Sequence, residues 1–337
     1  MVSGIIYREQ QGIKVTSQGN QQPRIGRIAR TILFASLAII LPGVQWSLFG
    51  WLYLFLPLVA FYTLSSYGGF IGKRLLGVTA VIAFVAYLLL NNIEFFGFSF
   101  ALLFSGYVLF VSADRHDSPA ISGLKSSLAL AGSWVVIFTV LSIGSDVSAY
   151  GQFLNSLDEG ITEATNYYRQ NNDISADTLL MLETTLHWMK VYIPLIMPSI
   201  LGSFILTLTW FTMVVGNVLL PKTGGSAPWM SYQFWQLPEK TIWLAIGAGL
   251  FVLLPIQILR TIGINVLVLL SMIYCFQGLS IAVFFMIKWK VPLLLRSFFY
   301  VMIIFQSFGT ILLLVFGIGD IWFDFRKLKQ KEGNQPK

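Results

Sequence analysis

Residues 263–287 read GINVLVLLSMIYCFQGLSIAVFFMI, a predominantly apolar run of 25 residues without a charged side chain. An α-helix crosses the hydrocarbon core of a bilayer with about 20 apolar residues. This segment therefore predicts a transmembrane helix, and similar runs recur along the chain. They lie at 30–41, 48–66, 70–90, 95–112, 119–143, 191–219, 241–259 and 297–319, with Pro42 and Gly43 breaking the first from the second.

The composition of the whole chain agrees with a membrane protein. Of 337 residues, 56% are hydrophobic and 11% are charged, and the mean hydropathy is +0.73. Soluble domains carry about 25% charged residues, so this chain has too few to cover a water-facing surface. A soluble enzyme, a disordered protein and a disulfide scaffold are excluded. We predict an all-α, polytopic transmembrane helix bundle with eight or nine hydrophobic helices in the bacterial inner membrane.

Charge sets the expected orientation. Basic residues gather in both tails, and basic segments that flank membrane spans usually mark the cytoplasmic side. With the N-terminus inside, the basic loops at 113–125 and 220–240 fall inside, and the acidic 144–190 loop falls outside. Nine crossings would leave the basic C-terminal tail outside, so we predict eight full crossings plus one shallow or re-entrant segment.

These patterns divide the chain into five parts. We expect a basic cytoplasmic tail at 1–29, five membrane helices within 30–143, an outer helical hairpin at 144–190, further membrane helices within 191–319 and a basic tail at 320–337. The hairpin is predicted from an amphipathic stripe over 147–168, a break at Asn171, Asn172 and Asp173, and a second stripe over 179–189 that runs into the sixth span. It is interpreted either as a lid over a binding site or as an element that packs on the bundle or on a second copy.

Catalytic and metal-binding patterns are missing from the sequence. His187 and Glu183 stand one helical turn apart, which favours an ordinary hydrogen bond on a helix face over a zinc site. No cofactor and no metal is predicted, and the chain is not expected to be an enzyme. Neither basic tail interleaves basic and aromatic residues, so nucleic-acid binding is not predicted. Lipids, a small-molecule ligand and a membrane protein are the expected partners.

Polar side chains at membrane depth are costly and therefore informative. Candidate substrate contacts at the first two outer turns are Gln45, Trp46, Asn91 and Glu94. Deeper candidates are Asn217, Asn265 and Gln277. Each deep amide has an alternative role, a hydrogen bond that bridges two helices and contributes about 0.6 kcal/mol on average.

The C-terminal third carries a pattern with a family resemblance. Trp235, Leu237 and Pro238 precede a span, Asn265 lies twelve residues before Gln277-Gly278, and Gly317, Gly319, Asp320, Asp324 and Arg326 close the chain. This layout resembles the YybS-like family of uncharacterised bacterial membrane proteins, which is distantly similar to the substrate-binding components of energy-coupling-factor transporters. The resemblance implies a six-span unit but no activity. The paired alanines four apart that dock a partner in those components are missing, because the first helix has Ala29, Ala35 and Ala38.

Two interpretations of the closing residues stay open. Asp320, Asp324 and Arg326 either anchor the last helix at the headgroups, with Arg326 on a phosphate, or dock a partner. For the whole chain, the leading hypothesis is a small-molecule binding or transport component with an outward-facing site under the hairpin. The alternative is a non-transporting membrane scaffold whose hairpin and tails recruit partners.

Overall fold

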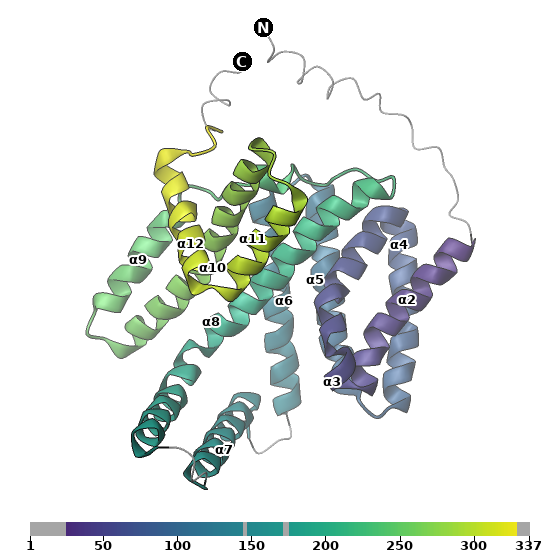
Figure 1. Cartoon of the computed structure of the whole chain (residues 1–337). Coiled ribbons are helices and arrows are strands. Elements are labelled where there is room, and N and C mark those ends of the chain that lie inside the picture. The colour runs from purple at the N-terminus through teal and green to yellow at the C-terminus, as the bar shows by residue number, and fades with distance from the viewer. Residues whose placement is uncertain (1–24, 144–146, 171–174, 329–337) are drawn as a thin grey trace.

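The structure is a computed structural model that describes residues 25–143, 147–170 and 175–328, and every regular element in these ranges is a helix (Figure 1). The elements are α2 (Ile25–Val44), α3 (Trp46–Phe49), η1 (Gly50–Phe55), α4 (Leu56–Leu89), α5 (Ile93–Asp114), α6 (Pro119–Ser142), α7 (Ala149–Gln170), α8 (Ala176–Lys222), η2 (Tyr232–Phe234), α9 (Thr241–Leu253), α10 (Gln257–Lys288), α11 (Leu293–Phe305) and α12 (Ser307–Phe323).

The described residues contain six helical segments that are long and apolar enough to cross a membrane, or seven if the bent pair α11–α12 is one span. The sequence predicted nine apolar runs, and two features explain the difference. The runs 48–66 and 70–90 count as one segment, Trp46–Leu89, although its helix is broken at Gly68, and the run 241–259 forms only α9, which has 13 residues.

Gly68 divides the long α4 into two parts. Its backbone is non-helical, with φ 76° and ψ 161°, a conformation that glycine adopts readily because it has no Cβ. A side-chain carbon added to Gly72 would lie 2.8 Å from the Cα atom of Leu64. Eight residues of straight helix would separate these positions by about 12 Å. The chain therefore folds back at Gly68, and the two parts lie side by side.

The predicted break at Pro42 and Gly43 is displaced. α2 continues through both residues to Val44, and the break falls at Gln45, whose backbone is extended with φ −147°. α2 also begins at Ile25, before the start predicted at residue 30. The predicted N-terminal tail lies mostly outside the described residues.

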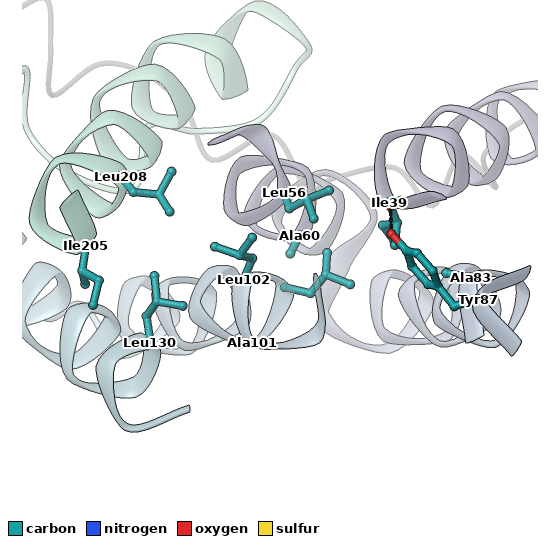
Figure 2. Packing of buried hydrophobic residues seen from close by; sticks show 11 residues of the cluster. Ile39, Leu56, Ala60, Ala83, Tyr87, Ala101, Leu102, Leu130, Ile205 and Leu208 are labelled. Atoms are coloured by element: carbon teal, nitrogen blue, oxygen red, sulfur yellow. Dashed lines mark hydrogen bonds between the residues drawn. The ribbon is translucent and has the colours of Figure 1, made fainter. Parts of the chain in front are cut away.

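One hydrophobic cluster joins α2, α4, α5, α6 and α8. Figure 2 shows Leu102 and Leu130 near Ile205 and Leu208, and Tyr87 directed toward α2. The Tyr87 hydroxyl donates a hydrogen bond to the carbonyl oxygen of Ile39 at 2.5 Å, so its polar end is satisfied inside the cluster. On the other side of α8, α10 packs against α9 and α12 (Figure 1).

The two helices expected in 144–190 are α7 and the first part of α8, which project together at one end of the molecule (Figure 1). Ser175 caps α8, as its hydroxyl accepts a hydrogen bond from the Thr178 backbone N–H at 3.3 Å. α8 then continues without interruption to Lys222, so the second helix runs into the following span as predicted. The predicted break at 171–173 lies outside the described residues.

Candidate functional site

The four candidate residues lie at two turns that are close in space. Gln45 and Trp46 lie at the turn from α2 to α3, and Asn91 and Glu94 lie at the turn from α4 to α5. Asn92 connects these turns, because its side-chain amide donates to the carbonyl oxygen of Gly43 at 3.2 Å. Trp46 lies 6.0 Å from the ring of Phe95, centroid to centroid. The side chains of Gln45, Trp46, Asn91 and Glu94 are all exposed, and none of them lines either cavity described below.

Asn217 holds the segment that follows α8. Its side-chain oxygen accepts from the Trp229 backbone N–H at 3.0 Å, and its amide nitrogen donates to the Met230 carbonyl at 3.2 Å. Trp229 stacks on Phe61 with ring centroids 5.5 Å apart. In this position Asn217 supports a loop.

Asn265 completes a broken hydrogen-bond ladder in α8. Its side-chain oxygen accepts from the Ser199 backbone N–H at 2.9 Å, and its nitrogen donates to the Leu195 carbonyl at 2.8 Å. In a regular helix these two backbone groups would bond to each other. Pro198 lies beside them within the helix, and insertion of a side chain into the ladder is a known cause of helix distortion. Asn265 therefore bridges α10 and α8, which is the alternative role considered for it.

Gln277 belongs to a buried polar cluster that contains several residues of the family pattern. Its side-chain oxygen accepts from the Leu237 backbone N–H at 2.8 Å, and its nitrogen donates to Asp320 Oδ2 at 3.0 Å. The same Asp320 oxygen accepts from Arg326 Nη2 at 2.8 Å. Arg326 Nη1 donates to the carbonyl oxygens of Gln233 and Trp235, at 2.8 and 3.0 Å.

This cluster corrects one prediction for the end of the chain. One of the two interpretations put Arg326 on a lipid phosphate, but its side chain is 0% exposed and it pairs with Asp320. Asp324 does not share a helix face with Asp320, because it adopts a left-handed conformation, with φ 39°, at the cap of α12. Its carboxylate accepts from the Leu328 backbone N–H at 3.0 Å.

A cavity of about 340 Å³ lies beside this cluster. Its walls are α6, α8, α10 and the segment that contains η2 and the start of α9. The lining is mainly apolar and aromatic, and it includes Leu124, Leu206, Trp210, Tyr232, Trp235, Leu237, Pro238, Ile273, Phe276 and Gln277. Small-molecule sites in proteins have this combination of an apolar lining and a few polar groups.

Two hydroxyl groups in the cavity wall have no hydrogen-bond partner among the described protein groups. They are the side chains of Ser127 on α6 and Thr209 on α8, which are 7% and 2% exposed. Serine and threonine hydroxyls in helices usually donate to the carbonyl four residues earlier, as Thr212 does to Leu208 at 2.9 Å. Each unpaired buried hydroxyl costs about 1–3 kcal/mol, so a group that pairs with either hydroxyl would offset part of this cost.

The Tyr232 hydroxyl, unlike those of Ser127 and Thr209, has a hydrogen-bond partner. It donates to the carbonyl of Phe276 at 2.5 Å. Burial raises the pKa of Tyr232 well above its ordinary value, so the phenol remains neutral. Phe276 in turn stacks on Trp210, with ring centroids 4.8 Å apart.

The cavity and the hairpin lie at opposite ends of α6. Residues Pro119 and Ala120, at the start of α6, line the cavity, whereas α7 follows the other end of this helix. The cavity is therefore remote from the predicted site under the hairpin. Of the seven predicted contact residues only Gln277 lines it. Sequence reasoning missed Ser127 and Thr209, because nothing in the sequence distinguishes an unpaired hydroxyl from a paired one, and it also missed Tyr232.

Two ion pairs join the two helices of the hairpin. Arg169 Nε donates to Glu183 Oε1 at 2.6 Å, which raises the pKa of Arg169, and Lys190 pairs with Asp158. Glu183 was expected to bond His187, whereas the structure pairs it with Arg169 across the hairpin. Among the described residues, no three His, Cys, Asp or Glu side chains gather as metal ligands would.

A sequence model of the family described as "Predicted membrane protein (DUF2232)" matches residues 32–321. The chain belongs to this family. It is a multi-pass membrane protein, and the expected likeness to an uncharacterised membrane family is confirmed at this level. Comparison with curated proteins and with solved structures gave no match.

The DUF2232 range contains all the residues that line the cavity, from Pro119 to Ser280. It also contains both partners of the bond between Gln277 and Asp320. Arg326, which completes the cluster, lies five residues beyond its end. The buried ion pair therefore joins the DUF2232 region to the segment that follows it.

Proposed function

We propose that this DUF2232 protein binds a small, mostly apolar molecule that carries one or two hydrogen-bonding groups. The main observation in support of this proposal is the cavity of about 340 Å³, whose wall contains Ser127 and Thr209 with their unpaired hydroxyls. An apolar ligand body would replace the contacts that a void lacks, and its polar group would satisfy the two hydroxyls. The resemblance to YybS-like proteins, and distantly to transporter substrate-binding components, agrees with a binding role.

We infer that the ligand enters from the bilayer. Three residues of the cavity wall also face outward, because Ile121 and Leu124 on α6 and Leu244 on α9 are 46%, 59% and 62% exposed. On a membrane-spanning surface these side chains contact lipid rather than water. An apolar molecule dissolved in the bilayer reaches such a wall directly, and a transport or delivery role would start from this bound state.

The proposed orientation places the cavity in the cytoplasmic half of a bacterial inner membrane. Lys73 and Lys125 lie near the cavity end of the bundle, close to the α5–α6 connection. The acidic hairpin lies at the other end. Basic cytoplasmic loops follow the positive-inside rule, which supports a cytoplasmic N-terminus.

Native mass spectrometry of the full chain, extracted gently from its own membranes, tests the binding proposal. We expect a retained small molecule, and we expect Thr209→Val and Ser127→Ala to reduce its retention by about two- to tenfold while the protein stays folded. Matched controls are Thr212→Val and Ser133→Ala, whose hydroxyls donate within their own helices. A protein that carries no such molecule, or equal retention in all four variants, contradicts the proposal.

The alternative function is that of a scaffold that docks a membrane protein. One observation favours it: the hairpin exposes large apolar side chains, with Tyr167, Leu180 and Met181 at 68%, 66% and 72%. Deletion of 147–172 should then abolish capture of crosslinked partners and leave ligand retention intact. An unchanged set of partners contradicts the scaffold role.

A further inference from the structure

A second cavity, of about 240 Å³, lies on the outward face of α5 and is separate from the first. Its apolar part is formed by Phe104, Tyr107, Val108 and Val111, which follow one face of the helix at spacings of three, one and three residues. Its other end is basic, because Arg115 and Lys125 complete the lining together with Ser112. We call this cavity the α5 slot.

Three neighbouring helices each bring one cation to the slot. Arg115 lies at the C-terminal cap of α5, and Lys125 lies on α6. Lys73 reaches over from α4, where its Nζ atom lies 5.4 Å from the ring centroid of Tyr107. The three side chains are solvent-exposed, so an anion at the mouth of the slot can reach them.

Two carboxylates in the connection reduce this charge without cancelling it. Asp114 is exposed at the end of α5. Asp117 accepts from Lys125 and from the Ser112 hydroxyl, both at 2.5 Å. These hydrogen bonds hold the pKa of Asp117 below its ordinary value, so the carboxylate stays charged and keeps Lys125 beside the slot. Three cations against two carboxylates leave the slot net positive.

The length of the slot matches one leaflet of a bilayer. Phe104 and Arg115 are eleven positions apart along α5, which corresponds to about 16 Å along a helix. Half of the hydrocarbon core measures about 15 Å. An acyl chain that lies along the apolar part would therefore bring its headgroup to the level of the cations.

We propose that the α5 slot binds one anionic glycerophospholipid, with an acyl chain against Phe104, Val108 and Val111 and its phosphate between Arg115, Lys73 and Lys125. The guanidinium of Arg115 suits this role, because its fork of N–H donors matches two phosphate oxygens. Basic pockets between transmembrane helices bind phospholipid headgroups by the same chemistry. This site requires neither Ser127 nor Thr209. A negative result for the proposed ligand cavity would therefore not contradict the lipid site, and the reverse also holds.

The test uses the full chain in nanodiscs that contain phosphatidylglycerol and phosphatidylethanolamine in equal amounts, followed by native mass spectrometry. We expect the wild-type protein to retain phosphatidylglycerol at least about tenfold better. Lys73→Gln combined with Arg115→Gln should remove most of this preference. Val108→Trp, which fills the apolar part, should reduce retention of the lipid while all the charges remain.

The matched control is Lys222→Gln, which removes an exposed charge that does not line the slot, and it should leave the preference unchanged. Lipid retention is compared only among variants whose thermal stability equals that of the wild-type protein. Equal retention of the two lipids by wild type, or equal loss in the control, overturns the proposal. Full displacement of the lipid by millimolar inorganic phosphate, or no effect of Val108→Trp, would indicate a simple anion site and also overturn it.

Discussion

Arg326 and Asp320 form an ion pair from which solvent is almost completely excluded. Their side chains are 0% and 1% exposed, and Nη2 lies 2.8 Å from Oδ2. A buried pair is tolerated only when further hydrogen bonds compensate for lost hydration. Here Gln277 donates to the carboxylate, and the guanidinium donates to two carbonyls of the 233–235 segment. The pair thus ties the end of α12 to a wall of the larger cavity.

The first prediction concerns removal of one member of this pair. Asp320→Asn should lower the free energy of unfolding by about 3–5 kcal/mol, because Arg326 keeps its charge in a buried site without a counter-ion. Thermal denaturation in detergent micelles measures the effect. Asp158→Asn is the control, since its pair with Lys190 is about half-exposed and such pairs contribute about 1 kcal/mol or less.

A double variant distinguishes loss of the pair from general damage to the site. Asp320→Asn with Arg326→Met should be more stable than Asp320→Asn alone, because the unpaired charge is gone. If Asp320→Asn is no more harmful than Asp158→Asn, the ion pair does not stabilise the fold as argued.

The second prediction concerns the crossing of α10 and α12. A Cβ atom on Gly278 would lie 1.9 Å from the carbonyl oxygen of Leu313, and one on Gly317 would lie 2.0 Å from that of Tyr274. Gly278→Ala should therefore force the helices apart and destabilise the protein by about 1–3 kcal/mol or more. Small residues allow this close approach of membrane helices.

Gly247→Ala provides the matched control for this substitution. Gly247 lies inside α9, and a Cβ atom there meets nothing within 4 Å. Alanine favours helix over glycine by about 1 kcal/mol, so this variant should be neutral or slightly stabilised. Equal melting temperatures for Gly278→Ala and wild type would show that α10 and α12 are not in close contact.

The third prediction separates a structural role of Asn265 from a ligand-binding one. Asn265→Ala leaves the Ser199 N–H and the Leu195 carbonyl unpaired, so it should lower stability by about 2 kcal/mol. Retention of the cavity ligand by the folded fraction should stay unchanged, because Asn265 does not line that cavity. Gln45→Ala, at an exposed turn, should affect stability by less than about 0.5 kcal/mol. Loss of the ligand from folded Asn265→Ala protein would instead indicate that Asn265 has a ligand-binding role.

The sequence was informative about helices because hydropathy is a property of local segments. The apolar runs, the helical hairpin and the continuation of its second helix into a span all follow from periodicity within a few turns. Pro42 misled the prediction by a few residues, because a proline near the end of a helix removes one backbone bond without stopping the last turn. The reversal at Gly68 was expected from the gap between two runs, but its geometry depends on a glycine backbone conformation that no pattern specifies.

The candidate site was much harder to predict. Asn217, Asn265 and Gln277 were recognised as unusual because polar groups are costly at membrane depth, whereas Asp320 was noted only as part of the family pattern at the end of the chain. Each of the three amides also bonds a backbone group that lies 12 to 70 residues away, such as Trp229 for Asn217 and Leu195 for Asn265, and these pairings exist only in the folded chain. The sequence placed the site at the outer turns because exposed polar residues gather there. The cavity instead lies between α6, α8, α10 and the segment that contains η2, and residue type alone does not specify how these elements are arranged.

The last prediction concerns the side of the membrane on which the chain ends. α11 and α12 meet at an angle of 100°, so they do not form one straight crossing, and a re-entrant pair returns the chain to its side of entry. Lys240→Cys and Lys327→Cys, in a background with Cys275→Ser, should then both be shielded from an impermeant thiol reagent in intact cells. Gly160→Cys, in the exposed face of α7, should be labelled, and all three should react after the membrane is permeabilised. Labelling of Lys327→Cys in intact cells would mean that α11–α12 crosses the membrane completely. Shielding of Gly160→Cys would instead overturn the orientation itself, because the acidic hairpin would lie on the same side as the basic loops.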